Sequence, residues 1–319
     1  MKNLDTFTKQ SMQEILPILQ NKLEIQDKIY CQVLNPDLGE GYAGENICID
    51  EVEYLYRSYK SWIDLAELLL CKMLTPLKSE HPLVILGFQK LSTQSFHKTN
   101  NKENKKEKYG TNSDFFHIYK MEEPAFFYYY NQALDNVNIK NKTRILNLGI
   151  NKADEFQVIK NKLDTNKYQN VDFIGIDHSE TAIAYAQSCF KENNVKFYSH
   201  DITALESLHL GRFDLLISIG TLQSPSINFK VFLMDLVQNY LTKDAAIILG
   251  FPNSRWLGGE MIYGAKAPNY AMSEMSLLYN DVIFAKKYLQ QHKYRVTLTG
   301  KHYVFLTATK IGLKPFLSP

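Results

Sequence analysis

Two short stretches of the chain place polar side chains at the ends of apolar runs. Asn147 lies within an apolar run that breaks at Gly149. Asp177 and His178 follow a second apolar run, Val171–Ile176. A buried strand, a glycine turn, a helix and a second strand that ends in a carboxylate form a nucleoside site in parallel α/β sheets. The chemistry predicted here is therefore the binding of a nucleoside cofactor.

The glycine turn argues against a dinucleotide by both pattern and charge. A pyrophosphate site requires G-x-G-x-x-G, but counting from Gly149 the second glycine position holds Asn151 and the last holds Asp154. Asp154 and Glu155 would put two carboxylates at the helix N-terminus, where a diphosphate must lie. We therefore expect a cofactor that carries no phosphate at this turn.

The elements that position these residues alternate between strand and helix. The predicted strands are Arg144–Leu148, Val171–Ile176, Val195–Ser199, Phe213–Ile219 and Ala245–Phe251. The predicted helices between them are Asp154–Leu163, Ser179–Asn193 and Asn228–Leu241. Because strands and helices alternate and the strands are continuously apolar, we expect a parallel sheet covered by helices on both faces.

The chain closes with a different pattern. Arg295–Thr299 and Tyr303–Thr309 alternate with period two and are joined at Gly300-Lys301, which predicts an antiparallel hairpin. The predicted fold class is therefore α/β, with a doubly wound, mostly parallel seven-stranded sheet that ends in an antiparallel C-terminal hairpin.

Residues 1–121 precede this pattern and are predicted to form a mainly helical accessory region that helps to define the substrate. Apolar residues repeat at intervals of three and four over residues 50–73, which predicts a helix. Glu122-Glu123-Pro124 predicts the start of another helix. We therefore expect two domains, residues 1–121 and 122–319.

A lysine-rich segment lies between two further predicted strands, Pro82–Phe88 and Phe115–Tyr119, which could pair. The segment Lys98–Lys108 contains five lysines and two glutamates. One interpretation is a solvated hairpin tip, because the glutamates interrupt the positive charge. The alternative is an arm that contacts the phosphates of an RNA substrate.

Together these features resemble the class I S-adenosylmethionine-dependent methyltransferases, over residues 122–310. The first motif of that family, acidic-x-G-x-G-x-G, aligns with Asn147 to Ala153, so that asparagine stands at the acid and Asn151 and Ala153 stand at glycines. Asparagine tolerates a left-handed backbone. The resemblance implies S-adenosylmethionine as the cofactor and a Rossmann-like sheet.

The resemblance also implies which residues contact the cofactor. The family acid that holds the ribose hydroxyls matches Asp177, and the acid beside the adenine amine matches Asp201. The family acid that contacts the methionyl amino group is replaced by Asn147. The predicted cofactor-binding residues are Asn147, Gly149, Asn151, Asp177, His178, Asp201, Ile202, Ile219 and Gly220.

The acceptor pocket is expected at the carboxyl ends of the fourth and fifth strands. An irregular, glycine-rich segment follows the fifth strand, and its predicted substrate-binding residues are Asn253, Arg255, Trp256, Glu260 and Tyr263. Arg255 would suit an anionic acceptor. A surface loop held by its own hydrogen bonds is the alternative for this segment.

The predicted function is methyl transfer from S-adenosylmethionine, with a small-molecule acceptor favoured. Gly220-Thr221-Leu222-Gln223 stands where the family places its base-methylating signature, which disfavours the exocyclic amine of a nucleobase. The alternatives are an RNA or tRNA methyltransferase that uses the Lys98–Lys108 arm, and a cofactor-binding module without catalysis. The pattern assigns no catalytic residue.

Composition limits the partners that the protein can bind and the compartment in which we expect it. The 319 residues carry a net charge of +2, which gives no global field for nucleic acid or an anionic membrane. No apolar run approaches the roughly 18 residues that a membrane span requires. The four cysteines are scattered and the N-terminus shows no secretory leader, so we expect reduced thiols and a cytoplasmic protein. The eight histidines show no ligand spacing, so no metal site is predicted.

Overall fold

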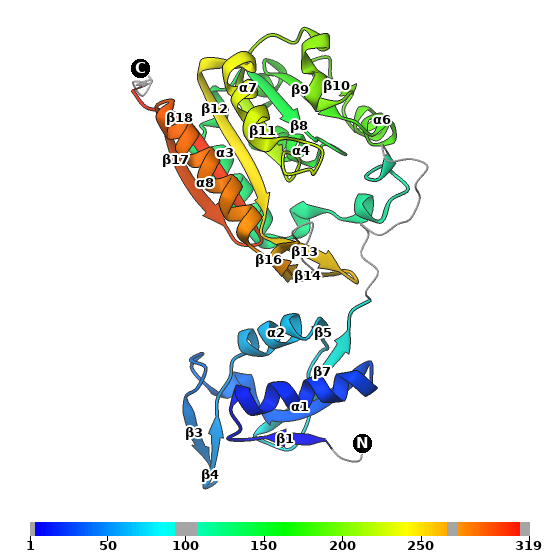
Figure 1. Ribbon diagram of the computed structural model, residues 1–319, viewed down its shortest axis with the longest axis vertical. Helices are drawn as coiled ribbons and strands as arrows, with labels where there is room; N and C mark the ends of the chain where they lie inside the picture. The colour runs from blue at the N-terminus through cyan, green and yellow to red at the C-terminus, as the bar shows by residue number, and fades with distance from the viewer. Residues whose placement is uncertain (1–3, 93–106, 267–272, 313–319) are drawn as a thin grey trace. The chain divides into compact units, whose positions relative to one another are not determined.

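The computed structural model describes residues 4–92, 107–266 and 273–312 (Figure 1). The chain divides into two compact units. The first comprises Met1–Ser95 with Trp256–Ile262, and the second comprises Phe96–Arg255 with Tyr263–Pro319.

The first unit is built on a five-stranded sheet with the order β1-β2-β7-β5, and β6 also pairs with β7. Its strands are β1 (Asp5–Phe7), β2 (Lys28–Leu34), β5 (Cys71–Met73), β6 (Leu77–Lys78) and β7 (Leu83–Lys90). Its helices are α1 (Met12–Ile25), α2 (Tyr59–Leu68) and the short η1 (Pro36–Leu38), and a separate hairpin pairs β3 (Asn46–Ile49) with β4 (Val52–Leu55). The buried side chains of α1 and α2 share one apolar core with β2 and β7.

The expectation of a mainly helical N-terminal region is wrong. The predicted helix over residues 50–73 is instead the strand β4, the helix α2 and the strand β5. Asp50 and Glu51 have φ values of 49° and 64°, so the backbone turns there and starts the second strand of a hairpin. The spacing of apolar residues from Val52 onward suits a strand, with period two, as well as a helix, with period 3.6. Hydrogen bonding to β3 selects the strand.

The second unit is built on a seven-stranded sheet with the order β10-β9-β8-β11-β12-β18-β17. Its strands are β8 (Arg144–Leu148), β9 (Asp172–Asp177), β10 (Val195–Ser199), β11 (Phe213–Ile219), β12 (Leu241–Pro252), β17 (Tyr294–Gly300) and β18 (Tyr303–Lys310). The first five strands in this order pair in parallel, whereas β18 pairs antiparallel with both β12 and β17. The predicted fold class of this sheet is confirmed.

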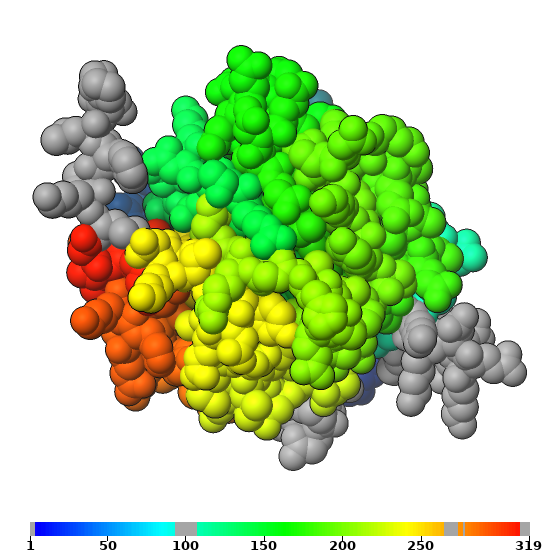
Figure 2. All heavy atoms as spheres, turned by 90° about the horizontal axis from the view of Figure 1, so that it is seen from above, coloured from blue at the N-terminus to red at the C-terminus, as the bar shows by residue number. Residues whose placement is uncertain are grey.

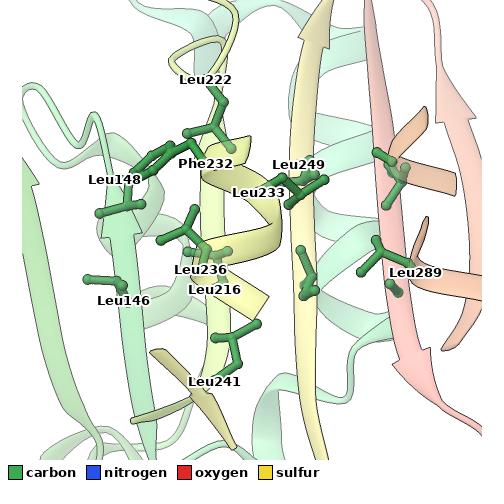
Figure 3. Packing of buried hydrophobic residues seen from close by; sticks show 14 of the residues in the cluster. Leu146, Leu148, Leu216, Leu222, Phe232, Leu233, Leu236, Leu241, Leu249 and Leu289 are labelled. Atoms are coloured by element: carbon green, nitrogen blue, oxygen red, sulfur yellow. The ribbon is translucent and has the colours of Figure 1, made fainter. Parts of the chain in front are cut away.

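Helices cover both faces of this sheet. One face packs against α3 (Pro124–Asn136), α4 (Asp154–Lys162), α5 (Thr165–Gln169) and α6 (Glu180–Cys189). The other face packs against η7 (Ile202–Leu208), α7 (Phe229–Asp235), the π-helical turn η8 (Leu236–Tyr240) and α8 (Ser276–Gln291). Leu146 and Leu148 of β8 face this second layer, and Leu148 lies beside Phe232 of α7 (Figure 3). Ile145, directly before Leu146, points to the opposite face and packs in the first layer.

The C-terminal hairpin completes the sheet. Gly300 has a φ of 128° in the turn, and the Lys301 N–H donates to the Tyr303 carbonyl oxygen at 3.0 Å. Seen from above, the segments that follow β8, in green and yellow, pack beside this hairpin and α8, in orange and red (Figure 2). Two smaller pairs complete the fold: β13 (Ser254–Leu257) with β14 (Glu260–Tyr263), and β15 (Ala265–Lys266) with β16 (Ser273–Glu274).

The segment before α3 differs from the prediction. The expected strand Phe115–Tyr119 is instead the short helix η4 (Asp114–His117), with η5 (Lys120–Glu122) after it. The Ser113 hydroxyl accepts the Phe116 N–H at 3.3 Å, so the local turn satisfies the backbone and no strand ladder is needed. The Lys98–Lys108 arm lies outside the described residues except for its last two. Nowhere in the described ranges is there a helix of the length and apolarity that a bilayer crossing requires.

Candidate active site

The turn after β8 keeps the backbone of a glycine-rich loop without its glycines. Gly149, Asn151 and Ala153 have φ values of 76°, 45° and 68°, so all three lie in the left-handed region. These are the three glycine positions of the motif. Left-handed backbone costs about 1 kcal/mol or more at an alanine. The turn therefore retains its shape although two of the three residues are not glycine.

Gly149 itself cannot be replaced without displacing a neighbour. A Cβ at this position would collide with the Thr221 side chain, which follows β11. The Gly149 N–H donates to the Ile176 carbonyl oxygen at 2.8 Å, and the Ser218 hydroxyl donates to the Leu148 carbonyl oxygen at 3.0 Å. These contacts bring the ends of β8, β9 and β11 together around the turn.

Asp177 ends β9 as a buried carboxylate in a fixed orientation. Its side chain accepts the Asn151 N–H at Oδ2 and the Ser179 N–H at Oδ1, each at 3.0 Å, and the residue is 5% exposed. A carboxylate has about four acceptor sites, so two remain for hydroxyl donors such as those of a ribose. The ring of His178 lies beside it, with Nδ1 at 3.5 Å from Asp177 Oδ1.

The remaining predicted cofactor residues follow β10 and β11. Asp201 accepts the Thr203 N–H and hydroxyl at 2.8 Å, and these bonds hold the pKa of Asp201 below its ordinary value. Ile202 after it is buried. The Gly220 N–H donates to the Gly250 carbonyl oxygen at 2.8 Å, directly after Ile219.

Strand pairing brings the nine predicted cofactor residues to one edge of the sheet, because they lie on or directly after the carboxyl ends of four adjacent parallel strands. The link from β9 to β10 is the His200 N–H, which donates to the Asp177 carbonyl oxygen at 2.8 Å. Asn147 is the most deeply buried polar member, at 1% exposure. Its Nδ2 has no hydrogen-bond partner among the described residues.

Sequence reasoning missed a segment that is fastened to this edge, residues 107–118. The Glu107 carboxylate accepts the Ser179 hydroxyl at 2.9 Å and the Glu180 N–H at 2.8 Å, and it also bonds the Thr181 hydroxyl. Burial raises the pKa of Glu107, but these hydrogen bonds outweigh it and hold the pKa below its ordinary value. The carboxylate thus closes the N-terminus of α6.

Two contacts attach the same segment to the turn after β8. The Asn151 amide donates to the Tyr109 carbonyl oxygen at 2.8 Å. The Lys152 ammonium donates to the carbonyl oxygens of Phe116 and Ile118, at 3.0 and 2.9 Å. The acceptors are main-chain carbonyls, which every sequence offers, so no residue pattern could have revealed these contacts.

The first turn of α4 carries two acids that the sequence analysis considered only as an obstacle to phosphate. Burial, followed by the charge of Asp154, raises the pKa of Glu155 to about 8, and Asp177 adds to this rise. Burial also raises the pKa of Asp154 to about 6, and the Lys152 ammonium 3.8 Å away opposes that rise. The edge of the sheet is thus rich in carboxylates.

Tyr303 at the start of β18 is a second residue that the sequence analysis did not single out. Its hydroxyl lies 3.3 Å from the position that a Cβ of Gly220 would take. Burial raises the pKa of Tyr303, and the charges of Glu123 and Glu155 raise it further. Glu123 pairs with Lys120 at 2.9 Å, while its Oε2 is buried with no partner in the described part of the chain.

The five predicted substrate residues are divided between the two units. Trp256 and Glu260 belong to the first unit, whereas Asn253, Arg255 and Tyr263 belong to the second. The Asn253 amide donates to the Lys301 carbonyl oxygen at 3.0 Å, and the Tyr263 ring lies 5.2 Å from the His302 ring.

Local hydrogen bonds therefore hold part of this loop, as the alternative interpretation expected. The Nε of Arg255 is buried without a hydrogen-bond partner among the described residues. The role of all five residues in acceptor binding stays a prediction.

The residues present fit S-adenosylmethionine better than a phosphorylated nucleoside. Asp177 offers acceptors for ribose hydroxyls, and the turn provides close backbone approach at Gly149. Asp154 and Glu155 stand at the helix N-terminus where a phosphate would have to lie, which disfavours a phosphorylated ligand. Lys152, the cation beside them, already donates to two carbonyl oxygens.

The sheet order, the antiparallel C-terminal hairpin and the carboxylate after the second strand define a class I S-adenosylmethionine-dependent methyltransferase. A family model described as "Methyltransferase domain" matches residues 139–298, which is half of the chain. The chain belongs to this family, and it is an enzyme that uses S-adenosylmethionine. No curated protein matches the chain in sequence.

Several solved structures are similar to part of this chain. Magnesium protoporphyrin IX methyltransferase from Synechocystis PCC 6803 is 16% identical, and the alignment covers 60% of this chain and 85% of that one with a TM-score of 0.39. Precorrin-6y C5,15-methyltransferase from Geobacter metallireducens GS-15 is 13% identical, with 57% and 87% covered and a TM-score of 0.40. A methyltransferase from Aquifex aeolicus is 13% identical, with 57% and 89% covered and a TM-score of 0.40.

Proposed function

We propose that this methyltransferase acts on a small-molecule acceptor, which binds where the ends of β11 and β12 meet the start of β18. The observation that carries this proposal is the position of the Tyr303 hydroxyl, 3.3 Å from where a Cβ of Gly220 would lie. The Tyr303 side chain is partly buried, and burial raises the pKa of its hydroxyl. A partly buried polar group at this edge of the sheet suits a compact acceptor that can be enclosed.

Methyl transfer from a sulfonium is an in-line displacement, and most of the catalysis can come from positioning. When bound, S-adenosylmethionine supplies the electrophilic methyl group. The chain then has to hold the ribose, which falls to the remaining acceptor sites of Asp177. The chain also has to orient the acceptor. We assign this role to the Tyr303 hydroxyl, because it can both donate and accept a hydrogen bond.

The loop after β12 is the proposed source of further acceptor contacts. Asn253 and Tyr263 lie beside the hairpin turn that precedes Tyr303. Arg255 adds a guanidinium whose Nε is buried and has no partner within the described ranges. A guanidinium of this kind suits a carboxylate or phosphate on the acceptor. We further propose that residues 1–121 act as the accessory region that helps to select the acceptor, with 122–319 as the methyltransferase domain.

A labelled-methyl assay tests the acceptor class. The protein is incubated with methyl-labelled S-adenosylmethionine and either a pool of small metabolites or total RNA. We expect label in a low-mass product, and we expect the Asp177→Ala variant to show none. Label found only in RNA would overturn the proposal in favour of an RNA acceptor. Transfer to neither pool, with cofactor still bound, would favour a module without catalysis.

A further inference from the structure

The residues of the turn after β8 offer no anionic partner for the ammonium of the cofactor. S-adenosylmethionine ends in an ammonium and a carboxylate, and an ammonium enclosed in a protein needs an acceptor, best an anionic one. Asn147, at the end of β8, is neutral. Its Nδ2 is a donor, is buried and has no partner among the described residues. The amide can offer an ammonium only its oxygen, and it offers no opposite charge.

A carboxylate lies close to the same turn. Glu155 stands in the first turn of α4, two residues after Ala153. α4 packs on the face of the sheet to which Ile145 points, and in strand alternation Asn147 points to that face too. The Tyr130 hydroxyl donates to the Glu155 main-chain carbonyl oxygen at 3.3 Å and so helps to fix this first turn.

The Glu155 carboxylate has no cationic partner within the described part of the chain. No lysine, arginine or histidine there forms an ion pair with it. Lys152 lies in the same turn, but its ammonium donates to two main-chain carbonyl oxygens and stands 3.8 Å from Asp154. The Glu155 side chain is partly buried. A carboxylate withdrawn from water without a cation beside it is costly to ionise, so a cationic ligand at this place would be favoured.

The first turn of α4 lies between the two ends of the cofactor site. On the acceptor side, the ring of Tyr130, whose hydroxyl bonds the Glu155 carbonyl oxygen, lies 6.2 Å from the Phe305 ring of β18, close after Tyr303. On the ribose side, Asp177 accepts the N–H of Asn151, four residues before Glu155. The methionine part of the cofactor must lie between its ribose and the acceptor. Glu155 therefore lies near the part of the ligand that carries the ammonium.

We infer that Glu155 supplies the negative charge that binds the methionyl ammonium of S-adenosylmethionine, and that it replaces the acid that is absent at Asn147. The acid has moved from the end of β8 to the first turn of α4. This inference rests on the cofactor site and does not depend on which acceptor is methylated.

Calorimetry with two ligands tests the inference, because only one of them carries the ammonium. S-adenosylhomocysteine carries the same α-amino group as S-adenosylmethionine, whereas 5′-methylthioadenosine lacks the whole amino-acid part. At about pH 8, where Glu155 ionises and the ligand still carries its ammonium, Glu155→Gln should weaken S-adenosylhomocysteine binding about 10- to 100-fold. The same variant should change 5′-methylthioadenosine binding by less than about threefold.

Two further variants complete the design. Asp154→Asn neutralises the adjacent acid and should change S-adenosylhomocysteine affinity by less than about threefold. Asn147→Asp in the Glu155→Gln background restores an acid at the family position and should recover most of the lost affinity. Unchanged S-adenosylhomocysteine binding by Glu155→Gln would overturn the inference, and so would an equal loss for both ligands. Failure of the unaltered protein to bind either ligand would instead overturn the cofactor site itself.

Discussion

The Asn151 main-chain N–H donates a hydrogen bond to Oδ2 of Asp177 at 3.0 Å. This bond joins the turn after β8 to the end of β9, so the loop that approaches the cofactor and the carboxylate that binds its ribose hold each other in place. Asn151 can make it because its backbone adopts a φ of 45°. The geometry of the cofactor site is therefore set in the fold before any ligand binds.

Replacement of Asp177 should remove both cofactor binding and part of this geometry. Asp177→Ala leaves the buried N–H groups of Asn151 and Ser179 without their acceptor, which should cost about 1–3 kcal/mol of unfolding free energy. Loss of the ribose contacts should weaken S-adenosylhomocysteine binding roughly 100-fold. Calorimetry and urea unfolding measure the two effects. Asp172→Ala, at the opposite end of β9, is the control and should leave the affinity unchanged.

Replacement of Gly149 should show how tightly β8 and β11 meet. Gly149→Ala combines left-handed backbone strain with a collision against Thr221, and should lower the unfolding free energy by roughly 2–4 kcal/mol. Gly211 has nearly the same φ, 75°, and its only close neighbour is the Arg144 guanidinium. Gly211→Ala should therefore cost about 1–2 kcal/mol, mainly from strain. Equal losses in the two variants would show that the contact with Thr221 does not matter.

The sequence predicts the residues at the ends of the parallel strands better than the turns and segments that pack over those ends. Asp177 could be predicted because an acid directly after an apolar strand of a parallel sheet has few alternative places. The left-handed backbone of Ala153 could not, since alanine rarely adopts it. The strand β4 was assigned to a helix because the apolar spacing from Val52 suits both periods. The attachment of residues 107–118 depends on main-chain carbonyls, which leave no trace in residue types.

Loss of the Glu107 carboxylate should loosen the segment 107–118. Glu107→Ala removes the acceptor for Ser179, Glu180 and Thr181, and amide hydrogen exchange in residues 109–118 should become faster. Because the folded pKa of Glu107 is depressed, its stabilising effect is present above its unfolded pKa. It should be lost as the pH falls through the folded pKa.

A control variant completes the test of Glu107. Lys108→Ala is the matched control and should exchange like the unaltered protein, because Lys108 only approaches the Tyr109 ring. Unchanged exchange in Glu107→Ala would show that this carboxylate does not hold the segment.

The hydroxyl of Tyr303 should matter for turnover and not for cofactor binding. Tyr303→Phe keeps the ring that packs against Phe126 and removes the group beside Gly220. We expect kcat to fall about 10- to 100-fold once an acceptor is known, with S-adenosylhomocysteine affinity within about threefold. Tyr294→Phe removes a buried hydroxyl from β17, and its kcat should stay unchanged. An unaffected kcat in Tyr303→Phe would remove this hydroxyl from acceptor binding.

Cofactor binding should release a proton near neutral pH. Burial, aided by the charge of Asp154, raises the pKa of Glu155 to about 8, so this group is mostly protonated at pH 7 in the free protein. A bound ammonium favours the ionised form, lowers the pKa and expels the proton. The affinity for S-adenosylhomocysteine should therefore increase as the pH rises toward 8.

The stability of the ligand-free protein should decrease with rising pH, whereas the affinity for the cofactor increases. Between the ordinary carboxyl pKa of about 4.5 and about 8, the folded state holds a proton on Glu155 that the unfolded state has lost. The unfolding free energy should then fall with rising pH, by roughly 1 kcal/mol per unit at most. Asp154, with a pKa of about 6, acts in the same direction over the lower part of this range. The titratable groups whose charges act on Glu155 or are acted on by it are Tyr130, Lys152, Asp154, Asp177 and Tyr303.

Calorimetry in two buffers of different ionisation enthalpy measures the released proton, and urea unfolding across the pH range measures the stability. Glu155→Gln should release less proton and show a flatter stability profile, because the amide does not titrate. Asp154→Asn should flatten the part of the profile near pH 6 and lower the pKa of Glu155, so that proton release on binding is retained but shifts to lower pH. A variant Glu155→Gln that releases as much proton as the unaltered protein would assign the titration to another group and leave Glu155 outside the ammonium site.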